Sequence, residues 1–183
     1  MDREQVLELL HKHIKNEKMI LHCLASEAVM RKMAERLRED PEEWGLAGLL
    51  HDIDVELTEA DPYTHGKMAR ELIGNVLPEN AIDAIEMHNE ISAGKERSAM
   101  FHHALAASET ITGLIFATAL VYPDKKLTSV KTKSVVKRMK EKHFAASVKR
   151  ENIMECERVG LTIDEFADIA LKAMCDISHK LGM

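Results

Sequence analysis

The segment Gly48-Leu49-Leu50-His51-Asp52-Ile53-Asp54 decides how the rest of the sequence can fold. An apolar run over residues 46–50 ends there in a histidine and an aspartate side by side. Apolar segments of this kind pack in cores, where a carboxylate without a partner is very costly. Imidazole nitrogen and carboxylate oxygen both bind divalent cations, so a metal is the most economical partner for Asp52. The segment therefore predicts a buried helix that carries metal ligands at its end.

The composition favours an all-helical protein. The 183 residues are 45% apolar and 4% aromatic, and they include 11 methionines but only 8 glycines and 4 prolines. Strong helix formers dominate, while the β-branched residues are few and scattered. A chain of this length suggests one domain with a substantial core. We therefore expect an all-α, single-domain protein.

Capping residues and apolar spacing predict where the helices lie. Asp40-Pro41-Glu42-Glu43 combines an N-cap, a proline at the first helical position and acids in the first turn. Thr162-Ile163-Asp164-Glu165 has the capping-box pattern that begins a last helix. The predicted helices cover residues 6–14, 16–37, 40–51, 63–76, 78–88, 99–121, 129–142, 152–158 and 162–180, with an acidic loop over 54–62 and a connection over 90–98.

Four more metal-capable residues lie in otherwise apolar surroundings on other predicted helices. They are His22, His65, His88 and Glu109. Singly, each has an ordinary explanation, such as a partly buried histidine, a helix-start residue or a carboxylate paired with a basic residue. Together with His51-Asp52 they offer ligands from five helices, which is how helical bundles build metal sites.

The charge is unevenly distributed. The net charge of −6 argues against a nucleic-acid-binding protein. Residues 125–150, however, hold ten Lys or Arg residues and one acid, Glu141. The preferred interpretation of this segment is a solvated helix face. The alternative is a wall that attracts phosphate beside an active site.

Three observations favour a cytoplasmic protein. Cys23, Cys156 and Cys175 are odd in number and lack the spacing of a metal site, which suits reduced thiols. The first residues do not resemble a signal peptide. The apolar stretch over residues 104–122 contains Glu109 and several hydroxyls, so we expect a buried core helix rather than a membrane span.

The order and local contexts of these residues resemble the HD superfamily of metal-dependent phosphohydrolases, and within it the HDIG-type subset. The resemblance covers residues 19–122, and residues 123–183 are more weakly similar to a helical extension of some members. The matching stretches are Ala47-Gly48-Leu49-Leu50-His51-Asp52-Ile53, Thr64-His65-Gly66-Lys67-Met68-Ala69 and Ala84-Ile85-Glu86-Met87-His88-Asn89-Glu90.

The resemblance implies an HD-type helical bundle over residues 1–122, with residues 123–183 as a helical extension packed on it in the same domain. It implies that one divalent metal is held by His22, His51, Asp52 and Glu109. A second would be held by His65 and His88, with Asp52 as the bridge. Fe or Mn is favoured as the metal, and Mg, Ni, Co and Zn remain possible.

The resemblance also implies hydrolysis of a phosphomonoester or phosphodiester, with a nucleotide as the expected small substrate. Asp52 and Lys67 are the expected catalytic residues, the lysine because it lies so close to His65 in sequence. Glu90 is either a proton donor or an exposed loop acid. The expected phosphate-binding residues of the basic segment are Lys133, Arg138 and Arg150.

The sequence departs from the family pattern at two positions. Asp54 replaces the glycine of HDIG, and we expect a loop residue there rather than an outer-shell group. Glu109 replaces the family's last metal-binding aspartate. Two alternatives to an enzyme therefore stay open: an HD domain that binds a nucleotide or a partner protein without turnover, and a helical domain whose histidines are merely packed.

Overall fold

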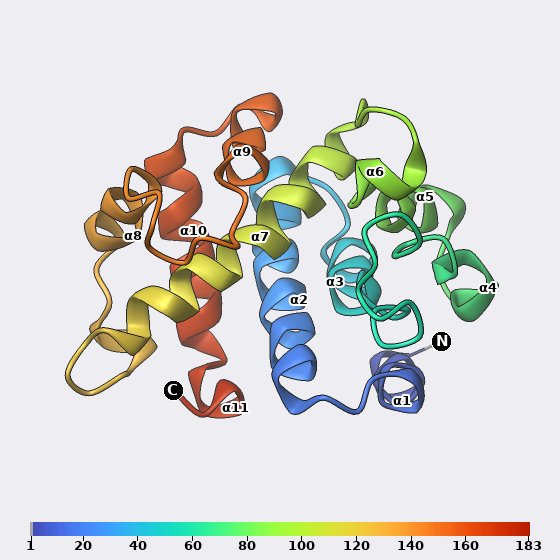
Figure 1. The fold of residues 1–183 in the computed structure, drawn as a ribbon, viewed down its shortest axis with the longest axis horizontal. Helices are drawn as coiled ribbons and strands as arrows, with labels where there is room; N and C mark the ends of the chain where they lie inside the picture. Colours follow the sequence, from blue (N-terminus) through green and yellow to red (C-terminus); the bar gives the residue numbers. More distant parts are fainter. Residues whose placement is uncertain (1) are drawn as a thin grey trace.

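Residues 2–183 are described by a computed structural model, and within this range the chain forms helices and connections without strands (Figure 1). The all-α prediction is confirmed. The helices are α1 (Arg3–His13), α2 (Glu17–Leu37), α3 (Pro41–Leu50), α4 (Ala69–Ile73), α5 (Glu79–Met87), α6 (Glu90–Ala93), α7 (Met100–Leu120), η1 (Leu127–Ser129), α8 (Thr132–Met139), α9 (Arg150–Ile153), η2 (Met154–Val159), α10 (Ile163–Asp176) and α11 (Ser178–Leu181).

Three of the predicted helix starts are confirmed by their caps. The Asn16 side chain accepts hydrogen bonds from the N–H groups of the first turn of α2. Asp40 does the same for α3, with Pro41 at the first helical position. Thr162 forms the predicted capping box at the start of α10. These caps satisfy backbone donors that a helix cannot satisfy internally, which is why such positions can be predicted from sequence.

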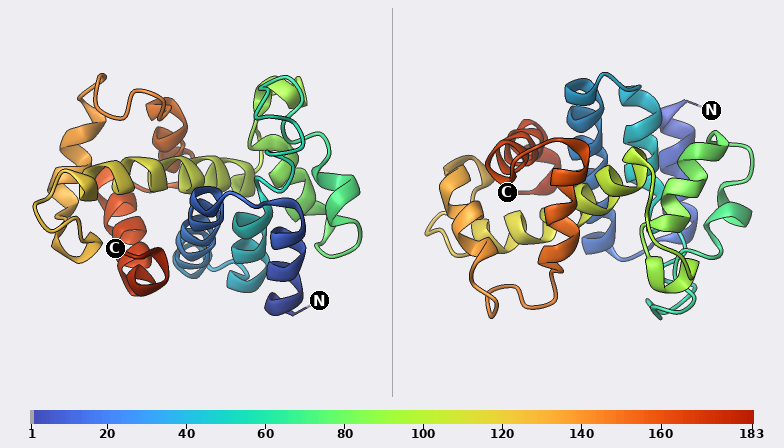
Figure 2. Two further views of the ribbon diagram at one scale, coloured as in Figure 1. Left: turned by 60° about the horizontal axis from the view of Figure 1, so that its bottom comes forward. Right: turned by 90° about the horizontal axis from the view of Figure 1, so that it is seen from above.

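Helix α7 runs across the middle of the molecule, and helices from both the N-terminal and the C-terminal half of the chain pack against it (Figures 1 and 2). It contacts α2, α3 and α5 of the N-terminal half and α8, α9, η2 and α10 of the C-terminal half. Its length and composition would suffice to cross a membrane, but 67% of its most apolar window is buried inside the fold. Such burial is typical of a core helix, because the neighbouring helices cover its apolar surface.

The approach of α3 to α2 requires a glycine. A Cβ atom on Gly48 would lie 2.8 Å from the carbonyl oxygen of Ser26 and 2.9 Å from the side chain of Met30. Only hydrogen fits at that point, so the two helix backbones come close together there. This contact fixes the end of α3, where His51 and Asp52 follow.

Two predicted helices are shorter in the structure. Of residues 63–76, only Ala69–Ile73 are α-helical, and His65 lies in the turns before them. The cause is a buried carboxylate, because Asp54 accepts the backbone N–H groups of Gly66 and Met68 at 2.8 and 3.1 Å and so holds this segment in turns. The basic segment is helical only over Thr132–Met139, and turns connect it to α9.

Candidate metal centre

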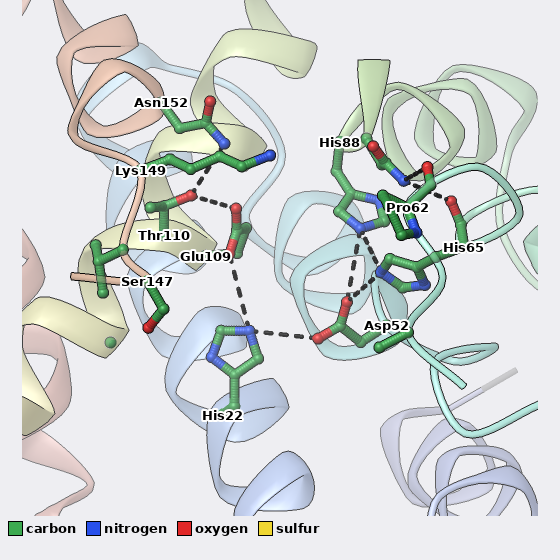
Figure 3. A pocket seen from close by; sticks show the side chains of 14 residues that line it. His22, Asp52, Pro62, His65, His88, Glu109, Thr110, Ser147, Lys149 and Asn152 are labelled. Atoms are coloured by element: carbon green, nitrogen blue, oxygen red, sulfur yellow. Dashed lines mark hydrogen bonds and ion pairs between the residues drawn. The ribbon is translucent and has the colours of Figure 1, made fainter. Parts of the chain in front are cut away.

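The predicted ligands come together around one cavity, although they are far apart in sequence. His22 comes from α2, His88 from the end of α5 and Glu109 from α7, while Asp52 and His65 come from the turns between α3 and α4 (Figure 3). The cavity has a volume of about 340 Å³. His51 is fully buried behind Asp52 and does not line the cavity surface.

Asp52 lies at the centre, and its two oxygens face two different pairs of histidines. Its Oδ2 lies 3.5 Å from Nε2 of His22 and 3.3 Å from Nε2 of His51. Its Oδ1 lies 3.0 Å from Nε2 of His65 and 3.6 Å from Nε2 of His88. The carboxylate therefore belongs to two groups that could each hold an ion, with Asp52 shared between them.

The spacing within each group suits ligands of a single ion. The Nε2 atoms of His22 and His51 are 3.1 Å apart, and those of His65 and His88 are 3.0 Å apart. Neighbouring ligands placed about 2.1 Å from one ion are separated by roughly 3.0 Å in octahedral and 3.4 Å in tetrahedral geometry. The donor atoms and their spacing thus fit two divalent metals.

The second ring nitrogen of every histidine is engaged outside the cluster. Nδ1 of His51 donates to the carbonyl of Gly48 at 2.8 Å, and Nδ1 of His88 bonds the carbonyl of Ile85. Nδ1 of His22 lies 2.9 Å from the Thr112 hydroxyl, which itself donates to a backbone carbonyl and so accepts from the histidine. Metal-binding histidines are oriented in this way, because a proton held on Nδ1 leaves Nε2 free for the metal.

Asp54 provides the outer contact of His65, and the expectation of a loop residue was wrong. Its side chain is fully buried and its Oδ1 lies 2.8 Å from Nδ1 of His65. With the N–H groups of Gly66 and Met68 it is surrounded by three donors. Asp54 therefore orients the ring of His65, a candidate metal ligand. The signal in the sequence was its position two residues after Asp52 in a buried segment.

Glu109 lies at the edge of the first group. Its Oε2 is 3.9 Å from Nε2 of His22, farther than the contacts of Asp52, and the carboxylate also accepts from the Thr110 hydroxyl. The longer side chain thus brings a carboxylate to the cavity wall without placing it within the tight three-residue group.

The pKa values of the cluster favour bound positive charge. Burial disfavours the charged form of His65, yet hydrogen bonds to Asp52 and Asp54 outweigh burial and raise the pKa of His65 to about 10. Burial and the neighbouring His51 lower the pKa of His22 to about 4, which keeps that ring neutral and able to bind a cation. Burial raises the pKa of Glu109 to about 7. A divalent cation would compensate the carboxylates in place of these protons.

The four basic residues expected beside the site are not among those lining the cavity. Lys67 is exposed and lines a separate cavity with Glu86 and Lys95, because the turn at Gly66 directs it away from His65. Lys133 is exposed on α8. Arg138 pairs with Glu141 and lies over the ring of Phe144, and Arg150 binds carbonyl oxygens of its own loop.

The structure adds residues that the sequence did not indicate. Ser147, Lys149 and Asn152 from the extension line the cavity, together with Thr110 and Asn89 (Figure 3). Lys149 belongs to the basic segment over residues 125–150. The alternative interpretation placed that segment beside the site, and the structure places this one lysine there. The sequence could not select it, because its position depends on how the loop after α8 folds back onto α7.

Comparison with known proteins gives one match. The family model described as "HD domain" matches residues 19–155, which is most of the chain and extends beyond residue 122 into the helical extension. No curated protein and no solved structure matches the chain.

Proposed function

The chain belongs to the HD domain family, and from this premise we propose that it is a metal-dependent phosphohydrolase acting on a small phosphate ester, with a nucleotide as the first candidate substrate. Members of this family are generally hydrolases. The proposal places the protein in the cytoplasm, where such substrates and reduced thiols occur.

One observation carries the proposal: the Asp52 carboxylate is shared between two histidine pairs. A carboxylate in this position can bridge two ions, and paired ions a few ångströms apart are the arrangement used to activate water and bind a phosphoryl group. His22, His51 and Asp52 would hold the first ion, with Glu109 as a further ligand. Asp52, His65 and His88 would hold the second, and Asp54 would orient His65.

The chain's own residues then have distinct tasks. In the metal-bound protein, the outer hydrogen bonds would hold the remaining histidine protons on Nδ1 and leave the Nε2 atoms for the metals. The buried setting of Asp52 strengthens its interaction with cations. When bound, the metals would supply a hydroxide for attack on phosphorus and neutralise charge on the phosphoryl oxygens. Mixed imidazole and carboxylate ligands favour Mn or Fe, with Mg, Co, Ni and Zn as alternatives.

The test combines metal analysis with a search for phosphate release. Protein purified without chelator should contain metal, and after loading with Mn²⁺ or Fe²⁺ it should release phosphate from at least one compound in a panel of nucleotides and other phosphate esters. Asp52→Ala serves as the blank, and circular dichroism confirms that it is folded. A wild-type protein that binds metal but releases no phosphate from the whole panel would contradict the proposal.

A second candidate is a metal-containing HD domain that binds a nucleotide without turnover. The position of Glu109 favours it, because its carboxylate lies 3.9 Å from Nε2 of His22 and outside the tight group. Glu109→Asp shortens the side chain to the residue typical of the family. Appearance of hydrolysis only in this variant would favour the binding function for the natural sequence.

A further inference from the structure

The wall of the cavity opposite His65 and His88 is formed by the helical extension. Ser147, Val148, Lys149 and Asn152 line it, while Pro62 lies with the two histidines across the cavity (Figure 3). The metal ligands occupy the floor and one side. A substrate bound to the metals must therefore face side chains of the extension.

Lys149 brings a positive charge into this space. Its side chain extends from the extension toward the gap between Glu109 and His88 (Figure 3). Within residues 2–183, no carboxylate lies within ion-pair distance of its ammonium group. By contrast, Lys137 and Arg138 of the same segment both pair with Glu141. The charge of Lys149 is thus available to a ligand of the cavity.

The backbone that carries Lys149 is fixed from three sides. The guanidinium of Arg150 donates to the carbonyl oxygens of Ala145 and Val148, both at 2.7 Å, and so closes the loop before α9. Val148 packs against Gly113 of α7, where an added Cβ would lie 3.2 Å from its side chain.

The third anchor is Asn152 on α9. Its Oδ1 accepts from the buried Arg97 at 3.2 Å, and Arg97 also donates to the carbonyl of the metal-ligand candidate His88 at 2.9 Å. These contacts fix the position of the extension relative to the candidate metal centre. Lys149 therefore has a defined place beside that centre.

We propose that Lys149 binds the phosphate oxygens of the substrate, on the side of the phosphoryl group that faces away from the metal ligands. It would take the role expected of Lys67, Lys133, Arg138 and Arg150. An ammonium group is a strong phosphate partner, because each N–H···O bond joins opposite charges. For turnover this inference rests on the proposed function, but phosphate binding can be measured without turnover.

The experiment measures binding of inorganic phosphate to the Mn²⁺-loaded protein by isothermal titration calorimetry. Lys149→Met should weaken phosphate binding by about 10-fold or more, the range for loss of a charge-assisted hydrogen bond, while bound Mn²⁺ stays unchanged. Lys149→Arg should restore most of the affinity. The matched control is Lys142→Met, which removes the same charge from an exposed lysine of the same segment that does not line the cavity.

The outcomes separate the two proposals. Unchanged phosphate affinity in Lys149→Met, or an equal loss in Lys142→Met, would overturn the role of Lys149. Selective loss in Lys149→Met supports it, even if the wild-type protein hydrolyses nothing. Failure of hydrolysis with intact phosphate binding counts against the hydrolase proposal alone.

Discussion

Replacing Asp54 by asparagine should weaken one metal site and spare the other. Asp54 Oδ2 accepts from the N–H groups of Gly66 and Met68, and Oδ1 accepts from Nδ1 of His65 at 2.8 Å. Asparagine has nearly the same shape but only one acceptor oxygen. If that oxygen keeps the two backbone donors, the amide NH₂ faces Nδ1 of His65.

The imidazole must then move its proton from Nδ1 to Nε2 in order to accept from this NH₂ group. A protonated Nε2 cannot bind an ion, so the affinity of the site that His65 and His88 form should fall. Loss of an outer-shell partner costs about 10- to 100-fold in metal affinity, or roughly 1.4 to 2.7 kcal/mol. The alternative amide orientation leaves two backbone donors facing an NH₂ group, which costs about 1–3 kcal/mol for each unsatisfied group and lowers stability instead.

The assay is titration of metal-free protein with Mn²⁺ by calorimetry, with bound metal counted by mass spectrometry. In the Asp54→Asn variant, the Mn²⁺ affinity of the site of His65 and His88 should fall by about 10-fold or more, while the affinity of the site of His22 and His51 should change by less than about 3-fold. Asp61→Asn is the matched control, because Asp61 is exposed in the same segment and its side chain accepts only from the N–H of Tyr63. Two unchanged binding events in Asp54→Asn, or an equal loss in Asp61→Asn, would refute this reasoning.

Three further predictions follow from other contacts of the site. In the protein without metal, burial raises the pKa of Glu109 from 4.5 to about 7, so the stability that this group contributes is full below about pH 4.5 and is lost as the pH rises to 7. Mn²⁺ affinity at the site of His22 and His51 should rise about 10-fold per pH unit below 7, because protons compete less for the Glu109 carboxylate. Calorimetric titrations at several pH values check this, and Glu109→Gln should flatten the slope. Gly48→Ala places a Cβ 2.8 Å from the Ser26 carbonyl oxygen. The cost of this overpacking should exceed the gain in helix propensity, so the free energy of unfolding should fall by about 1–2 kcal/mol. Scanning calorimetry should show a Tm lower by several degrees. Thr112→Val removes the acceptor of Nδ1 of His22 and should lower affinity for the first ion about 10-fold, whereas Thr112→Ser should not; equal titrations for both variants would contradict this.

The helical core and the residues that gather in the candidate metal centre could be predicted from sequence because their signals are local. Caps such as Asn16, Asp40 and Thr162 act within one turn of a helix. Histidines in apolar helices also stand out, since burial of such groups requires partners. The segment around His65 was harder, because a distant side chain, Asp54, decides its backbone by binding two N–H groups.

The basic segment shows the same limit. Ten cations within 26 residues look equivalent in sequence, yet the structure gives them different partners. Arg138 pairs with Glu141, Arg150 closes its own loop, and Lys149 faces the cavity. The partner of each cation depends on the path of the loop after α8 in the folded chain. No periodic pattern in the sequence encodes that path.

Arg97 has a consequence for how the chain unfolds. Its side chain is only 4% exposed, and it donates to the carbonyls of Met87 and His88 on one side and to Glu155 at 2.6 Å on the other. A fragment that ended at residue 122 would lose Glu155, and the buried guanidinium would keep only the partly exposed carboxylate of Glu90, at 3.4 Å, as its ion-pair partner. We therefore expect the candidate metal-binding core and the extension to unfold as one cooperative unit, in which loss of the C-terminal helices also loosens the backbone of His88.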